Sequence, residues 1–165
     1  MRILGIDPGL AIVGYGVIEA DHGRIKLVDY GTVTTPAGMA MPLRLSIVHD
    51  GIRKIMQTYT PDCVAFEELF FTNNAKTAIN VGQARGVAVI AARNAFSGEI
   101  YEYTPKQVKQ ALTGYGHADK NQIQQMVKLM LCLDHIPKPD DAADALAIAI
   151  CQANCPALSE QFVMR

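Results

Sequence analysis

The sequence lacks the features that mark several common classes of protein. No apolar run reaches the length needed to span a membrane, so no transmembrane helix is expected. The cysteines at 63, 132, 151 and 155 form no Cys-x-x-Cys pair, which argues against a structural zinc site. Nothing resembling a signal peptide precedes the first apolar segment, so we expect free thiols and a cytoplasmic location.

The motifs of several familiar catalytic machineries are also missing. The chain has no P-loop, no dinucleotide-binding glycine fingerprint and no recognisable Ser-His-Asp arrangement. Charge of neither sign dominates, because the formal net charge is −1. This balance hides a basic segment, residues 104–130, with four lysines and one acid. Such a segment is compatible with a polyanionic partner even in a nearly neutral chain.

Length and composition indicate one folded unit. The chain has 165 residues and is 50% hydrophobic, which is enough to build a full core. We expect a single domain over residues 1–155, followed by a short C-terminal tail over residues 156–165.

Three consecutive strands are predicted at the start of the chain. Residues 2–7 form an apolar run, residues 13–18 alternate, and residues 25–33 return after a hairpin signal. These strands would pair as an antiparallel meander. Gly14 and Gly16 leave one face of the second strand nearly bare, which suits either close approach of another element or a bulge.

Helices then alternate with two further strands. A helix is predicted around residues 45–59, an apolar strand at 63–68 and a long helix from 75 to about 94. A polar-alternating strand at 99–103 would lie at a sheet edge. A strand that follows a crossover helix runs parallel to its neighbour, so the strand at 63–68 should run parallel to the first strand.

Three shorter helices are predicted in the last third of the chain. Thr104 and Gln107 form a capping box for one, and Asp119 should cap the next. The glycine-rich loop between them carries Tyr115, as a nucleic-acid contact would, although a plain connection between helices would look similar. We expect Asp140 to be the N-cap of the last helix, whose apolar sequence predicts burial.

Four acids are notable for where they fall. Asp7 and Glu67 end two strands that should be parallel, so both should meet at one edge of the sheet. Asp141 and Asp144 share one face at the positive end of the last helix. Each could instead be an ordinary turn or first-turn acid. Together, an all-oxygen cluster suits Mg²⁺ or Mn²⁺, and two such ions can support phosphodiester hydrolysis.

These motifs resemble those of the RuvC family of bacterial Holliday-junction resolvases. The similarity covers nearly the whole chain and rests on Gly5-Ile6-Asp7-Pro8-Gly9, Glu67, Gly82-Gln83-Ala84-Arg85-Gly86, Gly114-x-Gly116-x-Ala118-x-Lys120 and Asp141-Ala-Ala-Asp144-Ala-Leu-Ala. The resemblance implies an α/β fold of the RNase H-like (retroviral-integrase superfamily) type, a five-stranded mixed sheet flanked by helices. It also implies resolution of four-way junction DNA by paired nicks, in recombination and repair.

The resemblance also assigns roles to particular residues. The family's four metal-binding catalytic acids correspond to Asp7, Glu67, Asp141 and Asp144. Lys109 and Lys120 correspond to basic residues near the scissile phosphate, and Phe70 to an aromatic that meets junction bases. Glu68 and Asp140 add acids beside the expected ones, so which carboxylate binds which Mg²⁺ ion stays open.

The family further implies a homodimer that works with the RuvA–RuvB branch-migration complex. Resolving a four-way junction requires symmetric cuts in two strands, so a two-fold dimer with one site per subunit matches the substrate. Ala78, Gly82 and Gly86 form a stripe of small residues that could face either the sheet or a second subunit. This stripe is the candidate dimer interface.

Two other functions share some of these features. A phosphotransferase of the actin and sugar-kinase kind also begins with a strand, an Asp and a Gly, but it needs a second lobe that this chain is too short to supply. A protein that binds junctions without cutting them could carry the same acids as structural groups. Metal-dependent cleavage of a junction would separate these alternatives.

Overall fold

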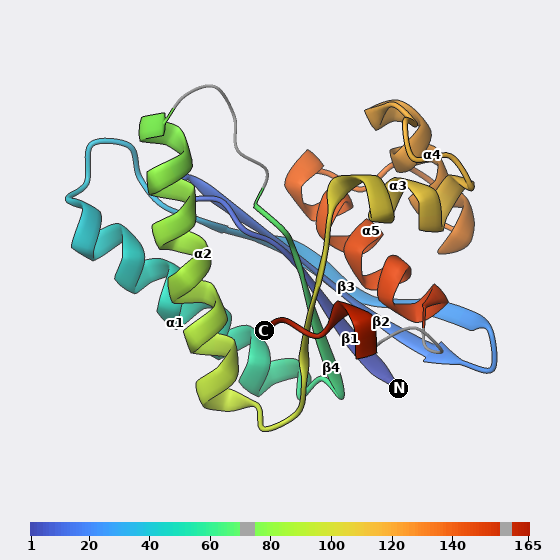
Figure 1. Cartoon of the computed structure of the whole chain (residues 1–165), viewed down its shortest axis with the longest axis horizontal. Helices are drawn as coiled ribbons and strands as arrows, with labels where there is room; N and C mark the ends of the chain where they lie inside the picture. Colours follow the sequence, from blue (N-terminus) through green and yellow to red (C-terminus); the bar gives the residue numbers. More distant parts are fainter. Residues whose placement is uncertain (70–74, 156–159) are drawn as a thin grey trace.

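A computed structural model of the chain describes residues 1–69, 75–155 and 160–165 and contains one sheet with helices on both faces (Figure 1). The strands are β1 (Arg2–Asp7), β2 (Ile12–Asp21), β3 (Arg24–Thr34), β4 (Cys63–Glu67) and β5 (Ile100–Tyr103). The helices are α1 (Met41–Tyr59), α2 (Ala75–Ala95), α3 (Pro105–Thr113), α4 (Lys120–Met130) and α5 (Asp140–Asn154). The five strands lie in the order β3-β2-β1-β4-β5.

The sheet is mixed, as predicted. Strands β1, β2 and β3 form the antiparallel meander, with a shift of register in β2 between Val17 and Ile18. Strands β4 and β5 both run parallel to β1, and Ile6 lies opposite Phe66. Parallel neighbours end at the same edge, so the last residues of β1 and β4 lie side by side there.

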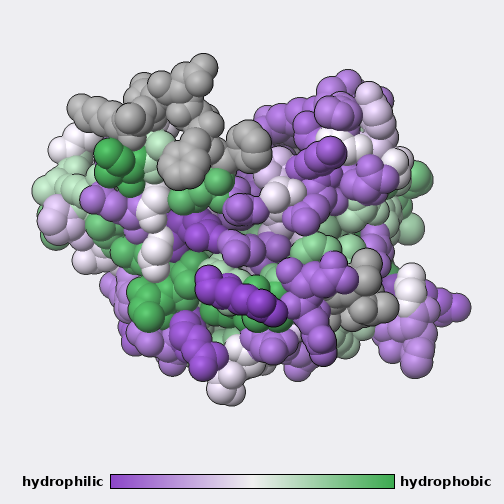
Figure 2. Space-filling view, in the orientation of Figure 1, coloured by the Kyte–Doolittle hydropathy of each residue, from purple (hydrophilic) through white to green (hydrophobic). Residues whose placement is uncertain are grey.

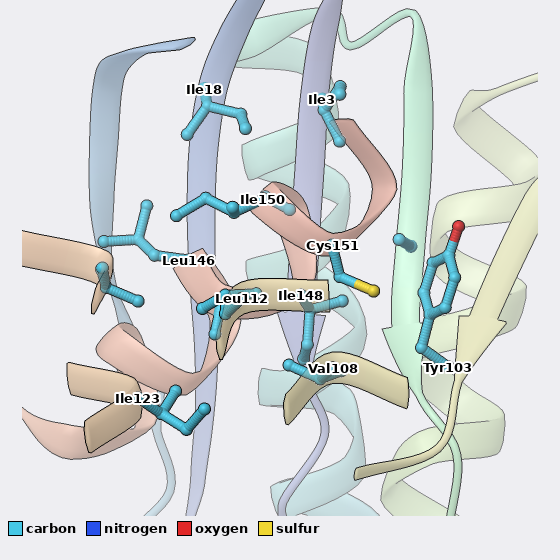
Figure 3. Packing of buried hydrophobic residues seen from close by; sticks show 14 of the residues in the cluster. Ile3, Ile18, Tyr103, Val108, Leu112, Ile123, Leu146, Ile148, Ile150 and Cys151 are labelled. Atoms are coloured by element: carbon cyan, nitrogen blue, oxygen red, sulfur yellow. The ribbon is translucent and has the colours of Figure 1, made fainter. Parts of the chain in front are cut away.

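Each face of the sheet has its own hydrophobic core. Helices α1 and α2 cover one face, where Val48, Ile52 and Ala88 are buried with residues of β1 and β4. Helix α5 covers the other face, and α3 and α4 pack over it, as Figure 3 shows around Ile148 and Leu112. The predicted burial of the last helix is confirmed, because every α5 residue from position 145 to 152 is buried.

Helix α5 lies directly on glycines of the sheet. A Cβ added to Gly5 would stand 2.2 Å from the carbonyl oxygen of Ala145. A Cβ added to Gly14 would stand 2.0 Å from the carbonyl oxygen of Asp141, and one at Gly16 would meet the next turn at 2.8 Å. Only glycine allows backbones to come this close. Close approach of another element is therefore observed at Gly14 and Gly16, and a register shift also lies directly beyond them, between Val17 and Ile18.

The predicted helix starts are confirmed at α3 and α4, whereas α1 begins at Met41, before the predicted residue 45, and the cap of α5 differs from the prediction. Thr104 caps α3 and Asp119 caps α4, each in a complete capping box. The expectation that Asp140 caps the last helix is wrong, because Pro139 is the N-cap and Asp140 is the first helical residue. The carboxylate of Asp140 instead forms ion pairs with two lysines, at 2.8 and 3.4 Å, so it does not cap the helix amides.

The described end of the chain lies along β5. Val163 forms an antiparallel bridge with Tyr101, and the amide of Met164 donates to the carbonyl oxygen of Ile100 at 2.8 Å. These contacts cover part of an edge that would otherwise expose unpaired backbone groups.

The sequence predicted no membrane-spanning helix and free cysteine thiols. None of the helices in the ranges given above is both long enough and apolar enough to cross a membrane. The four cysteines, all in the described part, are free thiols.

Candidate active site

The four acids named from the sequence lie at one end of the sheet. Asp7 ends β1 and Glu67 ends β4, at neighbouring places in the parallel pairing. Asp141 and Asp144 lie in the first turns of α5. Gly14, which is opposite Asp7 in β2, is also the glycine on which the backbone of Asp141 rests. This contact fixes the start of α5 beside the end of β1.

The carboxylates interact with one another. Burial, followed by the charges of Glu67, Asp144 and Asp141, raises the pKa of Asp7 to about 8. Burial and the charge of Asp144 raise the pKa of Glu67 to about 7. Burial also raises the pKa of Asp144. These effects follow from the placement of the four acids at one end of the sheet, because like charges at short range disfavour one another's ionisation.

Two lysines flank these acids. Lys109 of α3 and Lys120 of α4 line a cavity of about 190 Å³ together with Glu67 and Asp144. The Lys120 Nζ atom lies 3.1 Å from Asp144 Oδ2 and 3.4 Å from Asp140 Oδ2. Burial lowers the pKa of Lys120, but these ion pairs outweigh it and the pKa is raised overall. Both lysines lower the pKa of Glu67, against the effect of burial.

The donor set fits a hard divalent cation. The four acids offer only oxygen atoms, which Mg²⁺ and Mn²⁺ prefer to nitrogen or sulfur. A cation would also stabilise the charged forms of Asp7 and Glu67, whose pKa values are raised by burial and then by repulsion from neighbouring acids. Within the described residues, no three Asp, Glu, His or Cys side chains form a ready-made metal cage. Side-chain rotation at these backbone positions would therefore be needed to gather the oxygens around an ion.

Arg85 of α2 holds the end of β4. Its Nε atom donates to the carbonyl oxygen of Glu67 at 3.2 Å, and its guanidinium forms a 2.6 Å ion pair with Glu102 of β5. The amide of Glu68 donates to the carbonyl oxygen of Tyr103 at 2.9 Å. The backbone that carries Glu67 is thus held by a helix and by a strand. Arg85 belongs to the Gly82–Gly86 motif, but its role could not be predicted, because no local pattern indicates a contact across 18 residues.

Of the two aromatic candidates for base contacts, Tyr115 lies in the described part of the chain. Tyr115 is 58% exposed on the loop after α3, with its ring 5.6 Å from that of His117. It does not line the cavity that Lys109 and Lys120 share with the acids. Phe70 lies outside the described residues. A contact of either aromatic with DNA stays a prediction.

The small-residue stripe of α2 is exposed at Gly86 and half-buried at Ala78 and Gly82. A Cβ added to Gly86 would meet nothing within 4 Å, and one added to Gly82 would meet only Leu69, at 3.7 Å. Ile79 and Ile90 of the same helix are 62% and 50% exposed. Of the two neighbours considered for the stripe, the sheet is therefore excluded at Gly86.

The whole chain is similar to proteins of one family. Residues 3–152 match the family described as "Crossover junction endodeoxyribonuclease RuvC". The protein of that name from Alkaliphilus oremlandii is 57% identical over 165 residues, covering 100% of both chains. The relative from Clostridioides difficile is 58% identical over 155 residues, covering 93% of this chain and 90% of the relative.

Solved structures show the same similarity in three dimensions. The structure described as "T. thermophilus RuvC in complex with Holliday junction substrate" matches with a TM-score of 0.86 at 33% identity, covering 96% of both chains. This match confirms the prediction of an RNase H-like fold with a five-stranded mixed sheet. The chain therefore belongs to the RuvC family of crossover junction endodeoxyribonucleases.

Proposed function

We propose that the chain is a Mg²⁺-dependent endodeoxyribonuclease that resolves Holliday junctions by paired, symmetric nicks. One observation carries the proposal: four acids from three separate elements lie at one end of the sheet, where burial, followed by the charges of the other three acids, raises the pKa of Asp7 to about 8. Two lysines line the adjoining cavity, where a phosphate would approach. Membership of the RuvC family and the junction-bound T. thermophilus relative support the same substrate.

The side chains that would hold Mg²⁺ are those of Asp7, Glu67, Asp141 and Asp144, and Mn²⁺ should be able to replace it. Two such ions per site would supply activation of water and stabilisation of the leaving oxygen of a phosphodiester. Lys109 and Lys120 would place positive charge beside the phosphate. Because Lys120 pairs with Asp140 as well as Asp144, it would keep one carboxylate partner if Asp144 held a cation.

Contacts with the DNA bases are assigned to Tyr115 and Phe70. The exposed ring of Tyr115 supports a stacking role, which contributes roughly 1–3 kcal/mol per base. Phe70 is assigned from its correspondence to the family's junction-facing aromatic.

The active form would be a homodimer that joins through the exposed face of α2. Gly86 has open space around it and lies between the exposed side chains of Ile79 and Ile90. Gly86→Trp should therefore fold but dissociate the dimer in sedimentation experiments, whereas Lys54→Trp on the exposed side of α1 should not. A dimer that survives Gly86→Trp would place the interface elsewhere.

The expected partner of this dimer is the RuvA–RuvB branch-migration complex, by analogy with the family. The expected location is the cytoplasm, and the four free thiols fit a reducing compartment.

The decisive experiment incubates the protein with a synthetic four-way junction and Mg²⁺ and maps the nicks at nucleotide resolution. Paired nicks at symmetric positions in two strands are expected, while a linear duplex of the same sequence should stay intact. Equal nicking of the duplex would indicate a general nuclease. Binding without any nick would favour a junction-binding protein.

A further inference from the structure

A second groove adjoins the acids on the other face of the sheet. It has a volume of about 400 Å³ and is lined by the turn at residues 9–12, by Arg44 of α1, by residues 77, 80 and 81 of α2, and by Asp141. The cavity with Lys109 and Lys120 is built instead from β4, α3, α4 and α5. The acids therefore lie between two hollows, one toward α1 and α2 and the other toward α3 and α4.

Hydrophilic residues lie on the surface between the side formed by α1 and α2 and the side formed by α3 and α4 (Figure 2). A DNA strand with its cleaved bond at the acids has to extend to both sides of them. The lysines provide positive charge on one side only, so the other side needs a cation of its own if the backbone is to be held there.

Arg44 provides that cation in a fixed position. Its Nε atom donates to the hydroxyl oxygen of Thr35 at 2.8 Å. The Thr35 hydroxyl donates in turn to the carbonyl oxygen of Leu10 at 2.6 Å, and Thr35 is 6% exposed. Arg44 is thus anchored to the turn that directly follows β1, the strand that ends on Asp7.

The charge of Arg44 has no paired acid among the described residues. Within residues 1–69, 75–155 and 160–165 it forms no ion pair, although Asp141 lines the same groove. A guanidinium carries five N–H donors in a fork that matches two oxygens of a phosphate. Anchoring through Nε leaves the rest of that fork for a ligand, and Asn80 places an amide on the same groove.

We propose that this groove binds the phosphodiester backbone of the cleaved strand, on the side of the scissile bond opposite to Lys109 and Lys120, with Arg44 contacting one phosphate. This inference rests on the proposed function and extends it, because it assigns a second DNA subsite. The ligand is a phosphodiester of the junction strand, so recognition there is independent of base sequence.

The first test measures how junction affinity depends on salt, with Ca²⁺ replacing Mg²⁺ and the junction checked to be intact. Each lost phosphate contact lowers the slope of log K against log salt by about one. Arg44→Ala should show this change and bind several-fold more weakly, and Arg44→Lys should keep the slope but bind more weakly than the unsubstituted protein. The matched control is Arg53→Ala, an exposed residue of the same helix, which should bind as the unsubstituted protein does. A normal slope for folded Arg44→Ala would overturn the inference.

The second test locates the contact on the DNA. Single neutral methylphosphonate linkages are placed at successive positions on both sides of the nick. On one side of the nick, the effect of a methylphosphonate on binding should disappear in Lys109→Ala or Lys120→Ala. On the other side, one methylphosphonate should weaken binding of the unsubstituted protein but not of Arg44→Ala. If no methylphosphonate on that other side weakens binding of the unsubstituted protein, the inference is wrong. This outcome can be measured even if Arg44→Ala fails to fold, because it needs only the unsubstituted protein. Normal paired nicking together with this result would leave the proposed function intact.

Discussion

The two pairs of acids at the end of the sheet differ in their surroundings. Asp7 and Glu67 end buried strands, and within the described residues neither forms an ion pair. Asp141 and Asp144 lie at the positive end of the α5 dipole, and Asp144 is paired with Lys120 at 3.1 Å. Negative charge is therefore partly compensated on the helix and poorly compensated on the strands. A divalent cation would therefore gain the most interaction energy at Asp7 and Glu67, the acids on the strands.

Asp7→Asn should give the largest effect, because it removes the least compensated charge. We expect Mg²⁺-dependent cleavage to be abolished while junction affinity stays within a few-fold of normal. Without metal, the free energy of unfolding at pH 7 should rise by a few kcal/mol, since the pKa of Asp7 is raised from 3.8 to about 8. Nicking assays, binding assays and denaturant unfolding measure these quantities.

The control for this variant is Asp134→Asn, an exposed acid that should leave all three measurements unchanged. Unchanged cutting by Asp7→Asn would rule out its assignment as a metal ligand. A loss of stability in Asp7→Asn would show that the charge is compensated after all.

Gly14→Ala should displace Asp141 and Asp144, the two acids of α5, while leaving the acids of the strands in place. The added Cβ would stand 2.0 Å from the carbonyl oxygen of Asp141, so the first turn of α5 has to move. We expect a loss of at least about 1–3 kcal/mol of stability, the usual cost of overpacking, together with a large loss of cleavage. Gly16→Ala, whose contacts with Leu146 begin at 2.8 Å, should cost less of both. Equal effects at the two glycines would contradict the role given to the Asp141 contact.

Arg85→Leu should displace Glu67, one of the two acids on the strands, because its backbone loses the contact with Arg85. We expect cleavage to fall by roughly 10–100-fold, as for other residues that orient metal ligands, with little change in junction affinity. Stability should also fall, because Glu102 loses its partner.

The double variant Arg85→Leu/Glu102→Leu separates the two effects. Replacing both members of a largely buried ion pair by apolar residues is often nearly neutral for stability, so the melting temperature should recover. Cleavage should not recover, because the hydrogen bond from Arg85 to the carbonyl oxygen of Glu67 is still missing. Recovery of both would mean that Arg85 acts on stability alone.

A change of pH should have the smallest effect on cleavage. Asp7 and Glu67 have folded-state pKa values of about 8 and about 7, above their ordinary values of 3.8 and 4.5. The folded chain therefore binds more protons than the unfolded chain between these values, and metal-free stability should fall as pH rises from about 4 to 8. Cleavage at limiting Mg²⁺ should rise across pH 7–8, because metal competes with protons. Saturating Mg²⁺ should move that rise to lower pH, and an unmoved profile would mean that other groups control it.

Local sequence patterns predicted most of the fold. Alternation and hairpin chemistry predicted the meander, and Thr104 and Asp119 predicted the helix starts that the structure confirms. The meeting of Asp7 with Glu67 followed from the parallel arrangement of their strands. Their role as metal ligands stays a prediction, because it depends on an ion that the chain itself does not encode.

The features that sequence reasoning missed depend on partners from distant elements. The carboxylate of Asp140 pairs with Lys120 of another helix, so the local rule that makes Asp an N-cap failed there. The contacts of Arg85 with Glu67 and of Arg44 with Thr35 bring together residues from different elements. No periodicity within one segment records such a pairing.

The seat of α5 on the sheet has a genetic consequence. Any single-nucleotide change in a glycine codon that yields another amino acid adds a Cβ, and at positions 5 and 14 that atom would overlap a backbone oxygen of α5. Random mutagenesis should therefore recover almost no active clones altered at these codons, while it accepts varied residues at exposed positions such as 53 and 54. The distance between the two pairs of acids therefore depends on glycines at positions 5 and 14, which have no side chain to push α5 away from the sheet.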